Sequence, residues 1–420
     1  MIDCICLFES PSYTTLLPLV YFRPVYDLRC GILTLREKTS LNYPGIPLSL
    51  FCRTYLEEVM NQQNPELKVN QATGSNCLFI NGQIIVDNNF VKQVFINNED
   101  TVYVSGDKLA AVKISGKNLE LIKNKSTDFF TLLNFKNLPQ KNIAVKFLSY
   151  PWELVNQNGD QIISDFKLLT SQSNREKIRG TVYEGAHLLN NENLFIDEGS
   201  KIKPGVVLDG ESGPIYIGKN VIVYPSAVIE GPAYIGDNCR IKIGAKIYEN
   251  TSIGPFCKVG GEVEESIIHS YSNKQHDGFL GHSYLSSWVN LGADTNNSDL
   301  KNNYSSVKVI INGELIDSGT MFAGLIMGDH SKAGINTMFN TGTVAGVSSN
   351  IFGAGFPDKY IPSFSWGGSG SMITYNLQKS IETAKRVMKR RNVEMTSGDE
   401  KLFQKIFELT EKERKKYGNE

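Results

Sequence analysis

An isoleucine or valine occurs at every sixth position between residues 217 and 259. A step of six is three times the strand period of two and matches neither the α-helical period of 3.6 nor a heptad. All of these side chains therefore point to the same face of an extended chain. The eight positions are Ile217, Val223, Ile229, Ile235, Ile241, Ile247, Ile253 and Val259.

A longer period of 18 overlays the first, because an Ile-Gly dipeptide recurs at residues 217, 235 and 253. A step of six within 18 predicts triangular coils of three short strands that stack about 4.8 Å apart. Residues that tolerate left-handed backbone, such as Asn220 and Asn238, fall at the expected corners. We therefore predict a parallel β-helix through residues 200–350. A β-sandwich with regular hairpins is the alternative, and its strands rarely keep a fixed period.

The pattern changes after Val259. Residues 262–322 lose the period of six and carry polar runs, and the period of 18 returns at Met327 and Ala345. We predict that the coils are interrupted over this segment. Amphipathic stretches at 376–391 and 400–417 predict helices that cover the coil stack.

The front of the chain has a different pattern. Short apolar runs at 5–8 and 77–80 predict buried strands, and apolar residues at helical spacing predict a helix within 48–60. These features indicate a mixed α/β domain. The predicted domains are 1–185, 186–368 and 369–420.

Composition excludes several classes of partner. The net charge is −1 and 21% of residues are charged, which favours neither nucleic acid nor an acidic membrane. The seven cysteines include no Cys-x-x-Cys pair, so the sequence predicts no metal site or disulfide framework and is typical of a cytoplasmic protein. No apolar run is long enough to span a membrane.

Four of the five histidines lie in or beside the interrupted segment, at positions 269, 276, 282 and 330. Their spacing matches no metal-ligand motif. Loops inserted into a solenoid often carry function, and a histidine there can be a general base or simply a solvated loop residue. Of the four, His276 is the best-placed candidate for a base.

The coils, the histidine segment and the run Asn290-Leu-Gly-Ala293 resemble the bifunctional N-acetylglucosamine-1-phosphate uridyltransferase/glucosamine-1-phosphate acetyltransferase family. The front half is most similar to a divergent sugar nucleotidyltransferase branch with a hexapeptide-repeat C-terminal domain. That likeness rests on Leu17-Pro-Leu19, Arg23-Pro-Val25 and Arg29-Cys-Gly-Ile-Leu-Thr34. It implies an α/β nucleotidyltransferase-like domain, then a left-handed parallel β-helix and C-terminal helices.

The resemblance also implies an activity. His276 falls on the family's catalytic base, Asn290 on a conserved helper asparagine, and Lys242 on an arginine that holds the sugar phosphate. The implied enzyme is a cytoplasmic homotrimer that takes acetyl-CoA as co-substrate and acts on a sugar phosphate or nucleotide sugar. In the β-helix, Gly260 and Phe279 replace a lysine and a tyrosine of the family, so the acceptor can differ from glucosamine 1-phosphate.

The front domain departs further from the family. The stretch 8–13 has no glycine where the family has a phosphate-binding loop, and Gln83 stands where the family has a carboxylate that binds magnesium. Arg23 and Arg29 remain as candidate phosphate ligands. We therefore expect weak or no nucleotidyl transfer from this domain. A non-catalytic scaffold that binds a nucleotide sugar is the alternative to an acetyl-CoA-dependent enzyme.

Overall fold

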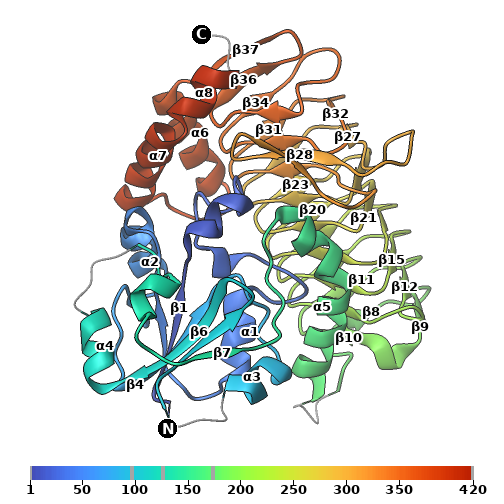
Figure 1. Cartoon of the computed structure of the whole chain (residues 1–420). Coiled ribbons are helices and arrows are strands. Elements are labelled where there is room, and N and C mark those ends of the chain that lie inside the picture. Colours follow the sequence, from blue (N-terminus) through green and yellow to red (C-terminus); the bar gives the residue numbers. More distant parts are fainter. Residues whose placement is uncertain (1, 95–98, 124–127, 172–175, 418–420) are drawn as a thin grey trace. The chain divides into compact units, whose positions relative to one another are not determined.

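The computed structural model describes residues 2–94, 99–123, 128–171 and 176–417 (Figure 1). The chain divides into two compact units. The first comprises residues 1–16, 22–28 and 33–150, and the second comprises 17–21, 29–32 and 151–420. Two short segments near the N-terminus thus belong to the second unit. The domain boundaries at residues 185 and 368 stay predictions.

The first unit is built on a seven-stranded mixed sheet with the strand order β3-β2-β1-β4-β6-β5-β7. Strands β2, β1 and β4 run parallel, and β6 runs antiparallel to β4. The strands are β1 (Cys4–Phe8), β2 (Leu48–Leu50), β3 (Lys68–Val69), β4 (Asn76–Asn81), β5 (Thr101–Ser105), β6 (Lys108–Ser115) and β7 (Gln140–Asn142). The helices are η1 (Pro11–Leu16), η2 (Val25–Asp27), α1 (Leu35–Asn42), η3 (Thr54–Leu56), α2 (Glu57–Gln63), α3 (Asn88–Val94), α4 (Gly116–Lys123) and η4 (Leu132–Phe135).

The buried central strands explain this order. Every residue of β1 is buried, as expected for a parallel strand covered on both faces. The helix predicted within residues 48–60 is wrong in its first half, because Leu48–Leu50 forms β2 beside β1 and α2 begins only at Glu57. Pairing with β1 outweighs the local helical spacing there.

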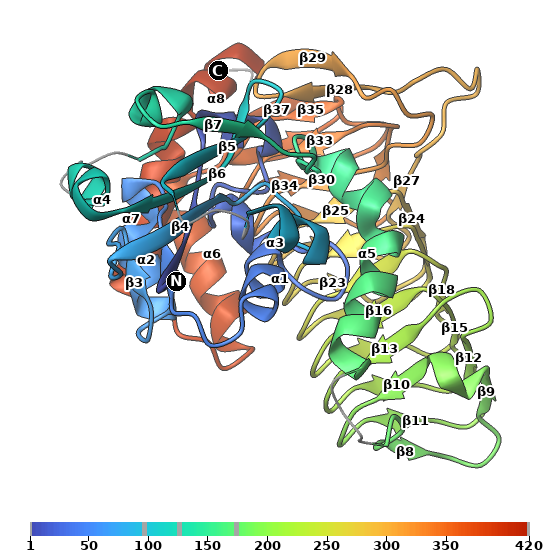
Figure 2. The same ribbon diagram turned by 60° about the horizontal axis from the view of Figure 1, so that its bottom comes forward.

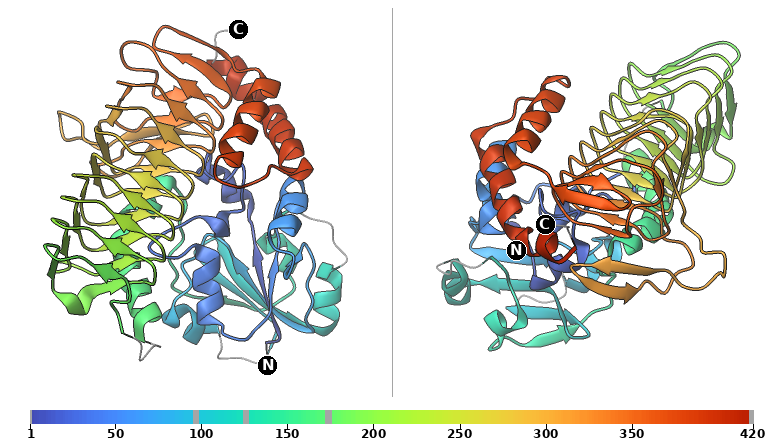
Figure 3. Two further views of the ribbon diagram at one scale, coloured as in Figure 1. Left: turned by 180° about the vertical axis from the view of Figure 1, so that it is seen from behind. Right: turned by 90° about the horizontal axis from the view of Figure 1, so that it is seen from above.

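The second unit is a parallel β-helix whose three faces are separate sheets (Figures 2 and 3). The nine-stranded face contains β10 (Leu194–Ile196), β13 (Ile215–Ile217), β16 (Ala233–Ile235), β19 (Thr251–Ile253), β22 (Ile267–Ile268), β25 (Tyr284–Leu285), β30 (Ile326–Met327), β33 (Val344–Ala345) and β35 (Tyr360–Ile361). The eleven-stranded face contains β8 (Thr181–Val182), β11 (Lys201–Ile202), β14 (Ile222–Val223), β17 (Arg240–Ile241), β20 (Lys258–Val259), β23 (Asn273–Lys274), β26 (Asn290–Leu291), β31 (Lys332–Ala333), β34 (Asn350–Ile351), β36 (Ser365–Gly368) and β37 (Ser371–Thr374). The third face contains β9 (His187–Leu189), β12 (Val207–Asp209), β15 (Val228–Glu230), β18 (Lys246–Ile247), β21 (Glu262–Glu264) and β24 (Phe279–Gly281), with β27 (Asn296–Asn297) and β32 (Met338–Phe339) as a separate parallel pair.

The predicted inward stack is confirmed, because all eight β-branched residues from Ile217 to Val259 are at most 1% exposed. Ile217 pairs with Ile235 and Ile235 with Ile253, so like residues lie above one another. The fold class is therefore confirmed, and the parallel sheets agree with a left-handed parallel β-helix.

The predicted interruption of the coils after Val259 is wrong in extent. Strand pairing continues without a break, but the coils shorten: Ser252 pairs with Ile267 and Ile267 with Tyr284. The coil therefore stays intact while the sequence period is lost. The real insertion begins near residue 300 and ends near 322, and it contains the antiparallel hairpin β28 (Lys308–Ile311) and β29 (Glu314–Asp317).

The long helix α5 (Pro151–Ser171) packs along the nine-stranded face, against β16, β19 and β25 (Figure 2). Its buried Asn158 accepts a hydrogen bond from Gly31 N and donates one to Asn250 O, both at 2.7 Å. Its buried Asp165 accepts a hydrogen bond from Ile32 N at 2.9 Å. These polar contacts hold the 29–32 segment on the β-helix.

The C-terminal helices predicted from amphipathic spacing are confirmed. They are α6 (Leu377–Lys389), α7 (Ser397–Leu409) and α8 (Glu411–Tyr417). Phe403 of α7 packs against the His330 ring of the coil stack with 4.9 Å between ring centroids. The helices therefore cover part of the β-helix surface.

Candidate functional site

The candidate site of the second unit begins with a column of polar side chains on the eleven-stranded face. Strand pairing places Arg240 beside Lys258, Lys258 beside Asn273, Asn273 beside Asn290, and Asn290 beside Lys332. Neighbouring strands lie about 4.8 Å apart, so these side chains form one continuous row. The predicted Asn290 is a member of this row.

His276 lies at the corner that follows β23, and its side chain is exposed. Strand register places Ile243 and Ile335 at the equivalent corner position of other coils. These two side chains are 71% and 72% exposed. His276 is therefore accessible, on an edge of the β-helix that also presents large apolar side chains.

His276 and Asn290 lie on neighbouring coils, but the described residues show no hydrogen bond between them. The Asn290 amide oxygen instead accepts a hydrogen bond of 3.3 Å from Asn273, three residues before His276. Asn273 in turn accepts a hydrogen bond from Arg391 at 2.6 Å. The structure thus connects Asn290 to a cation just beyond α6.

Lys274 is a site residue that the sequence prediction missed. It occupies an inward position, and its Nζ donates hydrogen bonds to Gly260 O at 3.1 Å and His276 O at 2.8 Å. Burial lowers the pKa of Lys274 to about 8, although Asp277 acts in the opposite direction. This buried amine fixes the backbone of the His276 corner. The sequence period did not reveal this inward position. Lys274 is the register partner of Val259 on the next coil, but it lies 15 residues later and not the 18 of the regular period.

Lys242 lies at the corner after β17, two coils from His276. Two coil spacings correspond to roughly 10 Å. The Nζ atom of Lys242 is 5.5 Å from the centroid of the Tyr224 ring, and the Lys242 side chain is half-buried. Lys242 and His276 therefore lie along the same edge of the β-helix, separated by about the length of a sugar phosphate.

His282 is not at this edge and has a structural environment. Its ring lies between two carboxylates, with Nδ1 2.9 Å from Asp299 and Nε2 3.3 Å from Glu265. It also stacks on Phe322, at the end of the insertion, with 4.7 Å between ring centroids. Burial would lower the pKa of His282, but the bonds to Asp299 and Glu265 outweigh burial and raise it to about 9.

This raised pKa predicts a pH-dependent stability. The folded pKa of His282, about 9, exceeds the ordinary histidine value. The protonated ring therefore stabilises the folded state fully below about pH 6.5, and this stabilisation is lost as the pH rises through 9. We expect the melting temperature of the wild-type protein to fall between pH 7 and 9.5, and a His282→Gln variant to lose most of that slope. His187→Gln, at an exposed position of β9, is the control for thermal melts. Equal slopes for the wild type and His282→Gln would contradict the ion-pair assignment.

The first unit has a cavity of about 310 Å³ at the carboxyl ends of β1 and β4. Strand order reverses between β1 and β4, which is where ligands bind in open α/β sheets. The lining residues are Ser10, Pro11, Ser12, Asn81, Asp107, Lys108, Leu109, Phe130, Thr131, Leu132, Leu133 and Phe147. The cavity is therefore a candidate nucleotide site by topology.

Magnesium does not fit the residues beside this cavity. The Gln83 amide oxygen accepts hydrogen bonds from Ser12 at 2.6 Å and Ser10 at 3.1 Å, and its amide nitrogen donates to Leu148 O. Both ends of the Gln83 amide are thus occupied by the protein. Asp107 is the sole carboxylate among the cavity-lining residues, whereas magnesium sites in proteins rely on carboxylates and phosphates.

The loop after β1 is held by a buried ion pair that the sequence did not reveal. Glu9 lies 3.0 Å from Arg53 Nε and accepts a hydrogen bond from Val25 N at 3.0 Å. Arg53 is 1% exposed and lies over the Tyr13 ring at 4.3 Å from its centroid. The stretch without glycine is thus held in place by side-chain contacts.

The two candidate phosphate arginines fall in different units. Arg23 belongs to the first unit and has a half-buried side chain, and its carbonyl accepts a hydrogen bond from Arg53. Arg29 belongs to the second unit and is 6% exposed. Its guanidinium donates to Ile32 O and lies 5.2 Å from the Tyr234 ring centroid. This burial favours a structural role for Arg29.

Three buried thiols lie together in the first unit, although their residues show no Cys-x-x-Cys spacing in the sequence. The sulfur atoms of Cys4, Cys6 and Cys77 all lie within 4.8 Å of one another. Cys4 and Cys6 point to the same face of β1. Cys77 lies on the neighbouring strand β4, in register with Cys4. The three residues belong to the apolar core of the first unit.

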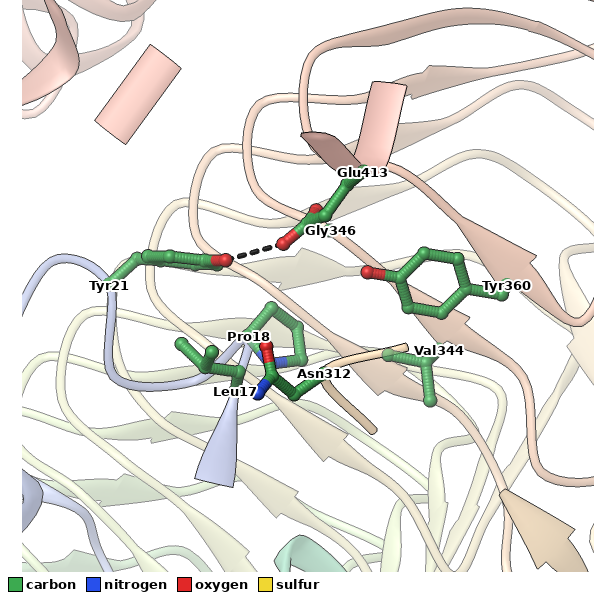
Figure 4. A pocket seen from close by; sticks show the side chains of 8 residues that line it. All are labelled: Leu17, Pro18, Tyr21, Asn312, Val344, Gly346, Tyr360 and Glu413. Atoms are coloured by element: carbon green, nitrogen blue, oxygen red, sulfur yellow. Dashed lines mark hydrogen bonds between the residues drawn. The ribbon is translucent and has the colours of Figure 1, made fainter. Parts of the chain in front are cut away.

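A second, much smaller cavity of about 10 Å³ lies in the second unit (Figure 4). The Tyr21 hydroxyl donates to Glu413 Oε1, and Ser363 donates to Glu413 Oε2 from its backbone and its hydroxyl. Burial raises the pKa of Glu413, and these hydrogen bonds act in the opposite direction. The space suits one water and is too small for a sugar, so this carboxylate has a structural role.

Two segments of the chain match family models. Residues 5–174 match the family model described as sugar nucleotidyl transferase, and residues 214–248 match the bacterial transferase hexapeptide model. A curated relative from Sulfurisphaera tokodaii, described as a bifunctional sugar-1-phosphate nucleotidylyltransferase/acetyltransferase, is 28% identical over 231 residues. The match covers 51% of this chain and 49% of the relative, so the chain spans about half the length of the curated relative it matches.

Solved structures of UDP-N-acetylglucosamine acyltransferases are similar only at a low level. A UDP-N-acetylglucosamine acyltransferase from Campylobacter jejuni is 14% identical with a TM-score of 0.26, covering 54% of this chain and 96% of its own. The Arabidopsis UDP-N-acetylglucosamine acyltransferase is 14% identical with a TM-score of 0.24, covering 57% of this chain and 82% of its own. These scores are too low to support an inference.

Among the described helices, none combines the length and the apolar character that crossing a bilayer requires. The predicted combination of domains is confirmed by the two family matches, although the identity to the curated relative is low. Residues 5–174 are therefore similar to the sugar nucleotidyl transferase family, and residues 214–248, within the parallel β-helix, are similar to transferase hexapeptide repeats.

Proposed function

We propose that this protein is a transferase of nucleotide-sugar metabolism whose β-helix unit moves an acetyl group from acetyl-CoA to an amino or hydroxy sugar. The sugar is carried on a phosphate or a nucleotide. The observation that supports this most is the exposed His276 corner, with Asn290 on the next coil and Lys242 two coils away along the same edge. The curated relative is described as an acetyltransferase as well as a nucleotidylyltransferase.

In the proposed reaction, neutral His276 accepts the proton of the sugar amine or hydroxyl as that group attacks the thioester carbonyl carbon. The carbon–sulfur bond of the tetrahedral intermediate then breaks. The leaving thiolate takes the proton back from the imidazolium, which yields the acetylated sugar and free coenzyme A. The reaction needs no oxidant and no metal.

The neighbouring residues position these reactants. The Asn290 amide can hold the acceptor or the coenzyme by hydrogen bonds without changing charge. Lys242 offers a positive charge to the sugar phosphate. The buried Lys274 amine keeps the carbonyl of His276 in place and thereby fixes the backbone that carries the imidazole.

For the first unit we propose recognition of a nucleotide or nucleotide sugar in the 310 Å³ cavity, with nucleotidyl transfer reduced or absent. The family match supports a nucleotide-sugar ligand. The engaged Gln83 amide and the lack of a second carboxylate in the cavity lining argue against catalysis assisted by magnesium.

We propose that the β-helix unit forms a homotrimer through the edge that carries His276. The exposed Ile243 and Ile335 on this edge supply apolar surface that an interface would bury. Sedimentation equilibrium at micromolar concentration should give three times the chain mass. An Ile243→Glu/Ile335→Glu double variant should sediment as a smaller species. A wild-type protein that sediments as a monomer would contradict this proposal.

A non-catalytic scaffold that binds a nucleotide sugar is the alternative function. Titration calorimetry with acetyl-CoA separates the two, because a scaffold needs no acetyl donor. Heat of binding with a stoichiometry near one per chain supports the enzyme, and its absence supports the scaffold. The described cysteines are buried and form no disulfide, which supports the proposed cytoplasmic location.

A further inference from the structure

The second unit concentrates positive charge at one place on its eleven-stranded face. Arg240 and Lys258 are paired neighbours in the column, and Arg391 reaches Asn273 on the next coil with a hydrogen bond of 2.6 Å. The last residues of α6 and its C-terminal cap add further charge beside the column. We call this group the cation cluster; its members are Arg240, Lys242, Lys258, Arg390 and Arg391.

The cations of this cluster repel one another and lack acidic partners. Among the described residues, no ion pair involves any of the five. The pKa of Lys258 is lowered, first by burial and then by the charges of Arg391, Arg390, Lys242 and Arg240. Arg240 donates to the carbonyls of Asn220 and Cys239, but among the described residues no carboxylate neutralises the cluster, so a bound anion would offset the repulsion between its members.

The spacing of the cluster indicates more than one phosphate. Arg240, Lys258 and the Asn273–Arg391 contact occupy three successive coils, a span of roughly 10 Å. A diphosphate with its substituents matches a row of this length better than a single phosphate does. Arginine is also the side chain best suited to bidentate contact with phosphate oxygens.

A ladder of aromatic rings runs beside the cluster. Phe256, Tyr271 and Trp288 each stand two residues before a member of the polar column, and their rings stack with centroids 4.7 and 4.2 Å apart. All three have positive φ, between 53° and 63°, which is an unfavourable region for bulky residues. Earlier coils place Asn220 and Asn238 at this corner instead.

The two ends of the ladder differ. At the upper end, beyond Trp288, the next corner residue is His330, whose ring is covered by Phe403 of α7. At the lower end, before Phe256, the next corner residue is Asn238. Tyr271 stacks on one face of the Phe256 ring, and no ring among the described residues stacks on its opposite face. Aromatic faces of this kind stack nucleobases. The Phe256 end of the ladder is also the end nearest Arg240 and Lys258.

We propose that the cation cluster and the lower end of the ladder form a binding site for a nucleoside diphosphate group, with the diphosphate on Arg240, Lys258 and Arg391 and the base on Phe256. Two ligands share this chemistry: coenzyme A, through its adenosine diphosphate portion, and a nucleoside diphosphate sugar. The proposal goes beyond the acetyl-transfer chemistry, because it assigns residues that take no part in proton transfer.

The test compares the wild-type protein with a Lys258→Ala/Arg391→Ala double variant by titration calorimetry. The ligands are UDP, UDP-N-acetylglucosamine, coenzyme A and glucosamine 1-phosphate. We expect the double variant to lose about 10–100-fold in affinity for UDP or for coenzyme A, since two charge-assisted contacts are removed. If the double variant loses affinity for coenzyme A alone, the ligand of the site is the acyl donor. If it loses affinity for the UDP compounds alone, the ligand is the nucleotide sugar. A Phe256→Ala variant should weaken the same ligand and leave glucosamine 1-phosphate unchanged.

A Lys201→Ala/Lys219→Ala double variant is the control for the loss of two positive charges, because both lysines are exposed on the β-helix away from the cluster. Unfolding of each variant is followed by circular dichroism. The proposal is overturned if the wild-type protein binds no diphosphate, if the cluster variant binds as the wild type does, or if the control variant loses as much affinity. Failure of acetyl transfer with retained, cluster-dependent binding would overturn the proposed function and leave this site standing.

Discussion

Replacing His276 with alanine is expected to lower acetyl-transfer turnover by about 10²–10⁴-fold, the usual contribution of a positioned proton acceptor. His276 is exposed at its corner, and Lys274 fixes its carbonyl, so removal of the ring should leave the coil intact. The affinity for acetyl-CoA should hardly change, because a base contacts the acceptor and not the coenzyme. Turnover is measured by thiol release, and affinity by calorimetry.

The structure determines which histidine serves as the control. His187→Ala is suitable, because His187 is exposed on β9, in a different part of the coil stack. His282→Ala is unsuitable, because it would leave Glu265 and Asp299 facing each other without their shared cation. Equal turnover of His276→Ala and the wild type would remove His276 from the mechanism.

The first unit is expected to release no pyrophosphate above background from a nucleoside triphosphate and a sugar 1-phosphate, with or without magnesium. Lost metal assistance removes several kcal/mol of transition-state stabilisation, enough for a rate reduction of at least about 10³-fold. The physical reason is local: the Gln83 amide is bonded at both ends, and Glu9 is paired with Arg53.

The assay is a coupled pyrophosphate measurement with the four common nucleoside triphosphates. A Gln83→Ala variant is a useful companion, because it should leave the background rate unchanged if Gln83 has only a structural role. Robust release of pyrophosphate that depends on magnesium would contradict the assignment of this unit as a binding domain.

Much of the β-helix could be predicted because its core repeats. Each Ile or Val from Ile217 to Val259 has a like neighbour above and below, so the packing constraint recurs at a fixed sequence interval. The prediction failed where coils shorten to 15 and 17 residues, between Ser252 and Tyr284. Backbone pairing tolerates such changes at corners, and a fixed step along the sequence does not detect them.

The candidate site was predictable only in part. Resemblance to the family pointed to His276, Asn290 and Lys242, and strand register places them on one edge and face. Lys274 was missed because its inward position follows from a shortened coil. Arg29 looked like a free surface cation, because nothing local shows that Tyr234 and Ile32 surround its guanidinium.

Contacts between distant segments were beyond sequence reasoning altogether. Asn158 and Asp165 of α5 reach the backbone of residues 31 and 32, more than a hundred positions earlier. The ladder of Phe256, Tyr271 and Trp288 was hidden for a similar reason, because unequal coils space its members by 15 and 17 residues.

The most direct test of acetyl transfer by the β-helix unit is mass spectrometry of products formed from isotopically labelled acetyl-CoA. The acceptors offered are glucosamine 1-phosphate, other amino-sugar 1-phosphates, hydroxy-sugar phosphates and UDP-linked amino sugars. The account predicts one labelled acetyl group on at least one acceptor, with free coenzyme A formed in equal amount and with loss of the signal in His276→Ala. No labelled product from any acceptor at micromolar enzyme would contradict it.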